Sequence, residues 1–467
     1  MSLKDDLPML VEHANMNKSY LRHNMNLFEI YEGKLLPFVE EDLRKMIPHS
    51  FETIKERIAP INVLKKIVDK LARIYQENPQ RMVIDGTDQD MELLEWYDLN
   101  FMTDKNMNVS NEFFNMHKAS LVQPYVHLGK PRLRTIPNHN FLVYSNDPVN
   151  PLRMTHLVVV VKEDATAGIT KKKMHVWTDE EFFIVVSDGK KTEIQHREMM
   201  ENNNPDGINP YGKIPYAYIN GSANLLQPLV DTDTFKMTKL IPVLLSDLNY
   251  AVMFQAFSIM FGIDVDSENL NMAPNAFWAF KSDASTDKAP QIGSIKPQVD
   301  IDQVLGLIQA ELAFWMNTRG LKPGAVGQVG AENFSSGVSK MIDEMDTSEM
   351  RQRQAQIYRE AEFNLWELVF KHMHPVWVQG NMIENNAMFT ESAHVITNFP
   401  PQLPIISRGQ LVADLKNEVD SGFISKRQAI KKLNPQLNDE EVSELLEEIE
   451  EEQGLRIDLN GLATSEN

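Results

Sequence analysis

The sequence lacks cysteine entirely and lacks the common signatures of enzymes. Without cysteine the chain can form neither disulfide bonds nor thiolate metal sites, and this composition fits a protein that is made and used in a reducing cytoplasm. No GxxxxGK(S/T), HExxH or GxSxG motif occurs, which argues against a P-loop motor, a zincin and a serine hydrolase. We therefore predict a protein that is not an enzyme and needs no cofactor and no metal.

Basic residues are scarce relative to acidic ones. The chain has 46 Lys and Arg against 66 Asp and Glu, a formal net charge of −20, and nine acids without a base lie between Asp439 and Glu452. Tight nonspecific binding to duplex DNA needs many cationic contacts with phosphates. The composition argues against such binding and is compatible only with weak, transient contact with nucleic acid.

One apolar segment, Leu240 to Gly262, has about the length of a membrane span. It contains Pro242, Asp247 and Gln255, and a central Asp alone costs roughly 2.5–3.5 kcal/mol on insertion scales. We therefore predict a helix buried by protein, and no membrane contact. The first residues show no apolar core followed by a small-residue cleavage site, so we expect no signal peptide.

The spacing of apolar residues changes from helical to strand-like within the first half of the chain. Helical spacing covers Val63 to Ile74. From about Val122 the period is two, through a series of short segments. The pair Asp188-Gly189 predicts a hairpin turn, and a second hairpin tip is expected at Thr166 to Lys173, with a run of three lysines exposed on it. Helices followed by an antiparallel meander are predicted.

The second half returns to helical spacing. We predict a helix from Leu226 to Phe261 that Pro242 breaks or kinks, then a small excursion that contains strands. Asp300 provides the cap of a second helix. A loop rich in glycine follows, and a long helix from Val338 to His374 is expected to end at Pro375.

The C-terminal part is predicted to be a separate helical unit. A short strand around His394 to Asn398 precedes the segment NFPPQLP, which we interpret as a domain boundary. Capping boxes at Ser407, Ser425 and Asn438 then predict three short helices. Together with the first half, these patterns predict an α+β fold.

Four stretches of the sequence, in this order, resemble the portal proteins of tailed double-stranded DNA bacteriophages. They are NVLKKIVDKLARIYQENP, NPYGKIPYAYINGSANLLQPLVD, AENFSSGVSKM and FISKRQAIKKLNP. Together they keep the order of that family over most of the chain. The resemblance implies a ring, usually of twelve subunits, at one vertex of the capsid, with double-stranded DNA passing through a central channel.

The resemblance also implies how the chain divides. The expected parts are a wing of helices and antiparallel strands (1–225), two stem helices (226–261 and 300–320), a clip between them (262–299), a tunnel loop (321–337), a long helix that returns to the wing (338–404), a small crown of three short helices (405–454) and a disordered tail (455–467). Because the crown is short, we expect no role that needs a large one.

Two of these parts contain candidate functional residues. The candidates for the DNA channel are Arg319, Lys322, Gly324, Gly327, Gly330, Asn333 and Ser335. The candidates for docking at the clip, which meets the tail adaptor and the packaging motor in the family, are Trp278, Phe280, Lys281 and Lys288. Arg319 and Lys322 either face the DNA, or cap the end of the stem helix and pair with acids. The loop glycines would let the loop change shape as DNA passes.

The acidic composition suits such a channel, because duplex DNA carries a charge about every 1.7 Å and slides past a negative wall without sticking. The resemblance implies these partners: other copies of the chain, double-stranded DNA in transit, the terminase large subunit, the head-tail adaptor, and the major capsid and scaffolding proteins. It implies a location in the virion, at the portal vertex, and in the host cytoplasm during assembly.

Two other functions stay open at this point. One is a different virion assembly protein or a head-tail adaptor ring. The other is a metal-dependent hydrolase that uses His372 or His374, although two imidazoles two residues apart on a helix point to different faces.

Overall fold

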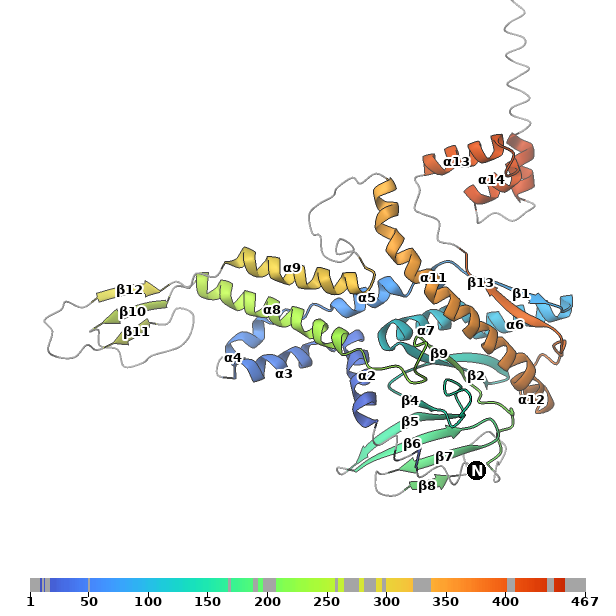
Figure 1. Cartoon of the computed structure of the whole chain (residues 1–467), viewed down its shortest axis with the longest axis horizontal. Coiled ribbons are helices and arrows are strands. Elements are labelled where there is room, and N and C mark those ends of the chain that lie inside the picture. Colours follow the sequence, from blue (N-terminus) through green and yellow to red (C-terminus); the bar gives the residue numbers. More distant parts are fainter. Residues whose placement is uncertain are drawn as a thin grey trace, which may run out of the picture. The chain divides into compact units, whose positions relative to one another are not determined.

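The computed structural model describes residues 9–10, 12, 17–48, 51–166, 169–187, 192–195, 207–256, 259–263, 277–280, 291–295, 300–321, 337–400, 408–434 and 441–449. The chain divides into two compact units, Met1–Gly330 with Asp346–Pro400 and Ala331–Met345 with Pro401–Asn467. Both helices and antiparallel sheets are present (Figure 1), so the predicted α+β class is confirmed.

Helices form the N-terminal part of the larger unit. They are α2 (Lys18–Tyr31), α3 (Leu36–Met46), α4 (Phe51–Ile54), α5 (Val63–Leu71), α6 (Asp88–Phe101) and α7 (Thr103–His117), with the short 3-10 turns η1 (Lys55–Arg57) and η2 (Ile74–Gln76) between them. The side chain of Asn62 caps α5 by accepting a hydrogen bond from the backbone N–H of Lys65, and Val63 and Ile67 are buried. The predicted helix is therefore confirmed, although it ends before Ile74.

Two antiparallel sheets follow. The strands are β2 (Ala119–His127), β3 (Lys130–Pro137), β4 (Phe141–Tyr144), β5 (His156–Thr166), β6 (Ile169–Trp177), β7 (Phe182–Ser187), β8 (Thr192–Gln195) and β9 (Ala217–Asn220). One sheet has the order β3-β2-β9, and the other is the meander β4-β5-β6-β7-β8. Strands β7 and β8 pair with Ser187 opposite Thr192, so the hairpin predicted around Asp188-Gly189 is confirmed; the two turn residues lie outside the described residues.

The second hairpin is tighter than predicted. Strands β5 and β6 pair as far as Thr166 opposite Ile169, so the three lysines 171–173 lie within β6 and not at the tip. Lys171 is opposite Asp164, and Lys172 is opposite Glu163. Opposite charges at facing positions favour a sheet, and like charges disfavour it. Lys173 is opposite Lys162, so facing charges account for only two of the three lysines.

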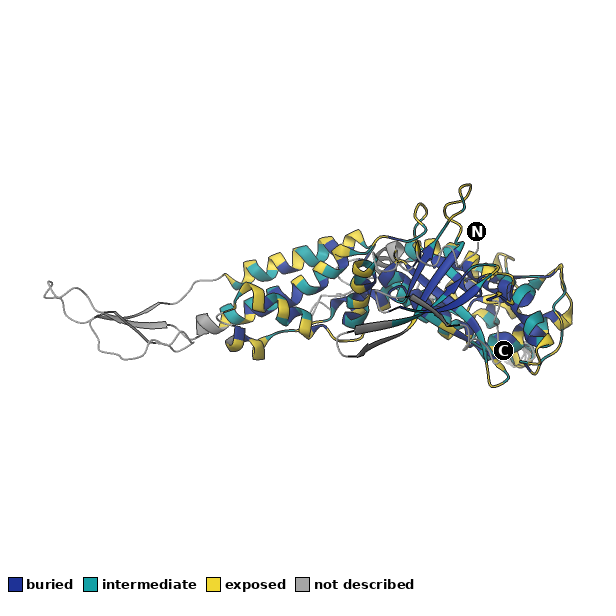
Figure 2. Cartoon of the chain, turned by 90° about the horizontal axis from the view of Figure 1, so that it is seen from below, coloured by how far each residue is buried: buried dark blue, intermediate teal, exposed yellow. Residues whose placement is uncertain are grey.

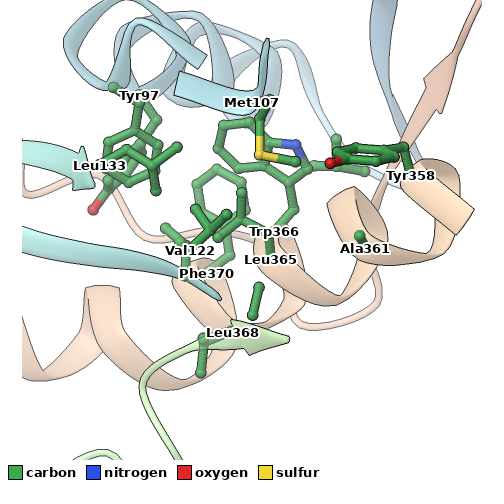
Figure 3. Packing of buried hydrophobic residues seen from close by; sticks show 14 of the residues in the cluster. Tyr97, Met107, Val122, Leu133, Tyr358, Ala361, Leu365, Trp366, Leu368 and Phe370 are labelled. Carbon is green, nitrogen blue, oxygen red and sulfur yellow. The ribbon is translucent and has the colours of Figure 1, made fainter. Parts of the chain in front are cut away.

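The main core packs the sheet β3-β2-β9 and helices α6 and α7 against the long helix α11 (Gly337–Glu367). Trp366, Leu365 and Tyr358 project from α11 into this core and are at most 1% exposed. Figure 3 shows Trp366 beside Met107 and Phe370. Replacing a buried side chain of this size by alanine costs about 3–5 kcal/mol, so this packing fixes the described part of α11 to the sheet.

The end of the long helix differs from the prediction, because Pro375 does not close it. A π-helical segment, η3 (Leu368–Met373), continues α11 and leads directly into α12 (His374–Gln379). Pro375 stands in the first turn of α12. A first-turn residue needs no intrahelical N–H bond, and the wider π turn shifts the hydrogen-bond ladder just before it.

Two helices, α8 (Thr232–Ala256) and α9 (Ile301–Thr318), correspond to the predicted stem helices. They pack on each other and on α5 around Ile241, Ile308 and Trp315. In α9 the side chain of Asp300 accepts from the backbone N–H of Gln303, so the predicted cap is confirmed. Figure 2 shows exposed residues along the sides of α8 and α9 that this pairing leaves uncovered.

The first of these helices is shorter than predicted. It begins at Thr232 instead of Leu226, because Asp231 caps it by accepting from the backbone N–H of Thr234 at 3.1 Å. It ends at Ala256 because the following apolar residues form strand β10 (Ile259–Ile263). Pro242 lies inside α8 without ending it. The residues on either side of it, Ile241 and Val243, are 3% and 5% exposed, and this packing offsets the missing hydrogen bond.

A small sheet follows α8. Strand β10 lies between β11 (Phe277–Phe280), which runs parallel to it, and β12 (Gln291–Ile295), which runs antiparallel. This sheet confirms the predicted strand-containing excursion. In the part of the chain that the structure describes, no helix is both long and apolar enough to cross a membrane.

The last strand, β13 (His394–Asn398), has the predicted bounds and pairs with β1 (Gln80–Ile84). The smaller unit contains α13 (Arg408–Asp420), α14 (Lys426–Leu433) and a helical segment at residues 441–449. The capping box of Ser425 with Gln428 is confirmed. The other two, at Ser407 and Asn438, lie outside the described residues.

Candidate channel segment and its anchors

Most of the candidate channel and clip residues fall outside the described residues. This holds for Lys322, Gly324, Gly327, Gly330, Asn333, Ser335, Lys281 and Lys288. Trp278 and Phe280 lie on β11, opposite Phe261 and Ile263 of β10. Residues two apart on a strand share one face of the sheet, so Trp278 and Phe280 belong to the same face of an edge strand.

Arg319 is the channel candidate whose contacts the structure defines. It stands at the C-terminal end of α9, three residues before the loop begins. Its Nη2 donates to Oδ1 of Asp231 at 2.6 Å, and its Nη1 lies 2.5 Å from Oδ2 of the same carboxylate. Of the two alternatives that the sequence left open for Arg319, the structure contains the pair with an acid.

Asp231 joins three elements at one carboxylate. It caps the first turn of α8, it holds Arg319 at the end of α9, and its Oδ2 is 3.8 Å from Nζ of Lys118, which follows α7. The side chain of Asp231 is 7% exposed and that of Arg319 is 19% exposed. Burial by itself would raise the pKa of Asp231, but the hydrogen bond and charge of Arg319 hold that pKa below its ordinary value. The group therefore stays ionised at neutral pH.

A cavity of about 420 Å³ adjoins this junction. Its lining includes Lys118, Arg319 and Arg353 together with one acid, Asp233. The bases outnumber the acids here, although the chain as a whole carries a net charge of −20. Asp231 offsets part of this positive charge, because it pairs with Arg319 and lies 3.8 Å from Lys118.

A second buried cluster anchors α11, the helix that follows the loop in the sequence. Glu362 is fully buried and accepts hydrogen bonds from Nε of Arg81 at 2.7 Å, from the hydroxyl of Tyr75 at 2.7 Å and from that of Thr397 at 2.6 Å. Arg81 also pairs with Asp98 at 3.2 Å. Burial alone would lower the pKa of Arg81, but Glu362 and the neighbouring aspartates raise it overall. This network ties α11 to both strands of the β1-β13 sheet.

The two histidines considered for a hydrolase have structural partners. His374 is fully buried; its Nδ1 lies 2.7 Å from the hydroxyl of Tyr97, and its Nε2 lies 2.7 Å from the carbonyl oxygen of Ala387. Nδ1 of His372 is 3.2 Å from the carbonyl oxygen of Tyr211. Among the residues that the structure describes, no group of three or more metal-ligating side chains is placed to hold an ion. Nothing in this geometry favours a hydrolase.

The comparison with known families decides the assignment. The family model for phage portal proteins of the SPP1 Gp6-like type matches residues 9–455, which is nearly the whole chain. The chain belongs to the phage portal protein family. A search of curated individual proteins gave no match. The resemblance inferred from four short motifs is therefore confirmed.

The sequence indicated candidate channel residues through glycines and bases, but not the residues that anchor the neighbouring helices. Asp231 precedes a helix and could have been recognised as a cap. Its partners Lys118 and Arg319 are 113 and 88 positions away, and no pattern in a single sequence connects them. Arg81 and Glu362 were missed for the same reason, since each looks like an ordinary charged residue until burial brings them together.

Proposed function

We propose that copies of this chain form the portal ring, of about twelve subunits, at one vertex of a phage capsid. Double-stranded DNA passes through the central channel during packaging and ejection. The role is structural and needs no catalytic group or cofactor. The observation that carries this proposal is the family match over residues 9–455.

The described surface of the stem supports assembly into a ring. On α9, Leu307 and Phe314 are 54% and 72% exposed, and with Gln303, Ala310 and Asn317 they follow the helical repeat along one side. This side has no charged residue, whereas the opposite side packs on α8 through Ile308 and Trp315. An uncharged second face on a helix is typical of a protein contact, and a neighbouring subunit would cover it.

For the remaining parts of the chain, the functions that we propose follow from the family. The loop from Lys322 to Ser336 lines the channel, and the junction at Asp231 holds both its stem helix and the wing in place. The small sheet β10-β11-β12 docks the terminase large subunit and the head-tail adaptor through the face that carries Trp278 and Phe280. The wing and crown meet capsid and scaffolding proteins. A head-tail adaptor ring is the less supported function, because the family match names portal proteins.

Electron microscopy of the purified protein tests the proposal. We expect rings with a central hole for the wild-type protein. Phe314→Asp should reduce the fraction of protein in rings, because it places a charge in the contact between neighbouring stems. Leu99→Asp is the matched control, since Leu99 is 78% exposed on α6. A protein that stays monomeric under all conditions, and that immunolabelling finds away from the vertex where the genome enters, would contradict the proposal.

A further inference from the structure

A cavity lies between the two sheets of the larger unit and α12. Its volume is about 610 Å³, and its lining includes Tyr125, Trp177, Trp377 and Met382. Trp177 and Trp377 are 2% and 0% exposed. The indole rings are held by the core, so this wall of the cavity is formed before any ligand enters.

The charge of this cavity is the reverse of that of the chain. None of its lining residues in the described structure is Asp or Glu, although the chain has 66 of them, and Arg134 is present. Nε of Arg134 donates to Oε1 of Gln123 at 2.6 Å, and its guanidinium lies 5.7 Å from the centre of the Tyr125 ring. Within the described residues no carboxylate pairs with it. One carboxylate, Glu384, lies near the rim at Gly129 without lining the cavity.

His175, a second ionisable side chain of the cavity, is neutral at physiological pH. Burial, with smaller effects of Arg134 and Lys173, lowers the pKa of His175 to about 4. The indole Nε1 of Trp177 and the hydroxyl of Tyr216 are buried neighbours, and neither completes a hydrogen bond of normal geometry within the described residues. The hydroxyl of Tyr216 interacts with both Arg134 and Trp177, so Arg134 is the group of this cavity that supplies a fixed positive charge.

The rim carries an exposed apolar side chain in a strained turn. Leu128 is 85% exposed and has φ 51°, and the next residue, Gly129, has φ 75°. Both central positions of this two-residue hairpin turn are left-handed, which is the type that favours Asn-Gly. A leucine there costs about 1–2 kcal/mol. This strain is explained if the side chain of Leu128 contacts a binding partner.

We propose that this cavity binds a short segment of another protein, in which a carboxylate side chain stands next to an apolar one. Arg134 takes the carboxylate, because a guanidinium pairs with carboxylates in a bidentate manner. Leu128, Tyr125 and the adaptable side chain of Met382 contact the apolar neighbour. The inference does not depend on ring formation, and it concerns a part of the chain remote in sequence from the stem and its loop.

A second copy of this chain is the poorer occupant. Several of its exposed apolar side chains stand beside acids that are already bonded within the chain, although the exposed Ile84, next to Asp85, is not among them. Asp98, next to the exposed Leu99, pairs with Arg81. Asp147, near the exposed Val149, accepts from two backbone N–H groups. The turn with Asp420 and Phe423, which is 83% exposed, is an exception, and the experiment includes it.

Peptide binding to the full-length protein tests the proposal. The probe is N-acetyl-Glu-Leu-Phe amide, and the matched control is the same peptide with Gln in place of Glu. Binding is followed by calorimetry and by tryptophan emission, because Trp177 and Trp377 line the cavity. We expect the Glu peptide to bind about tenfold more tightly than the Gln peptide, and Arg134→Gln to remove that difference.

Arg132→Gln is the control variant. Arg132 lies on the same strand as Arg134 but donates to the carbonyl oxygen of Asn100 and does not line the cavity, so its loss should leave binding unchanged. The proposal would be overturned if the two peptides bound equally, or if both variants lost binding. It would also be overturned if no binding were detected at about 1 mM peptide, the range of weak complexes. Tighter binding of a peptide with the sequence of residues 418–425 would also overturn it, because a second copy would then be the occupant.

Discussion

The junction at Asp231 allows a direct test of what holds α8 and α9 to each other and to the end of α7. The variant Asp231→Asn keeps a side chain that caps a helix well, but it removes the negative charge. Arg319, whose side chain is 19% exposed, is then left without its partner. Breaking a buried pair by removing one side costs about 3–5 kcal/mol. Because Arg319 retains some contact with water, we expect a cost below this range, about 2–3 kcal/mol.

The assay is urea unfolding followed by tryptophan emission. All six tryptophans of the chain lie in the larger unit, so the signal reports the unit that contains Asp231. A double-mutant cycle with Arg319→Gln isolates the pair, at one protein concentration so that assembly affects all variants equally. We expect a coupling energy of about 2 kcal/mol. Asp233→Asn, an exposed position in the same helical turn, should change stability by less than about 0.5 kcal/mol.

The pH dependence supplies an independent check. The pKa of Asp231 is lowered in the folded protein, so its contribution is present above the unfolded value of about 3.9 and is lost as pH falls through the folded pKa below that. The difference between wild type and Asp231→Asn should therefore persist at pH 7 and shrink below about pH 4. A coupling energy under about 0.5 kcal/mol, or a difference that does not change with acid, would refute the reasoning about this junction.

Three further outcomes are expected. Alanine at Gly324, Gly327 and Gly330 together should lower the amount of DNA packaged per particle without loss of rings, because it restricts the loop; unchanged packaging would argue against a loop that changes shape. Glu362→Gln should lower the free energy of unfolding by about 3 kcal/mol, against less than about 0.5 kcal/mol for the exposed Glu360→Gln, and equal effects in urea unfolding would contradict the role of the buried network. Burial lowers the pKa of His117 to about 3, so its contribution is complete above about pH 6.5 and is lost as pH falls toward 3, with about 2 kcal/mol gone at pH 5. His117→Gln should flatten this acid dependence of the unfolding free energy, and the exposed His127→Gln should leave it unchanged.

The elements whose signals are local could be predicted from the sequence. The cap at Asp300 sets the start of α9, the apolar spacing of Val63 and Ile67 defines the buried face of α5, and alternation with a turn at Asp188-Gly189 specifies strands that pair in order. These signals act over a few residues, so they can be read from one chain. They also sufficed for the fold class and, with four motifs in order, for the family.

The features that depend on distant residues could be seen only in the folded chain. Local rules ended a helix at Pro375 and placed three lysines on a turn, but a π turn precedes Pro375, and strands β5 and β6 pair as far as Thr166 opposite Ile169. Asp231 meets Arg319, and Glu362 meets Arg81, across 88 and 281 positions of sequence. The interaction energy of such a pair depends on burial, because two charges interact strongly only where water is excluded. Burial belongs to the folded chain, so spacing along the sequence does not encode these partners.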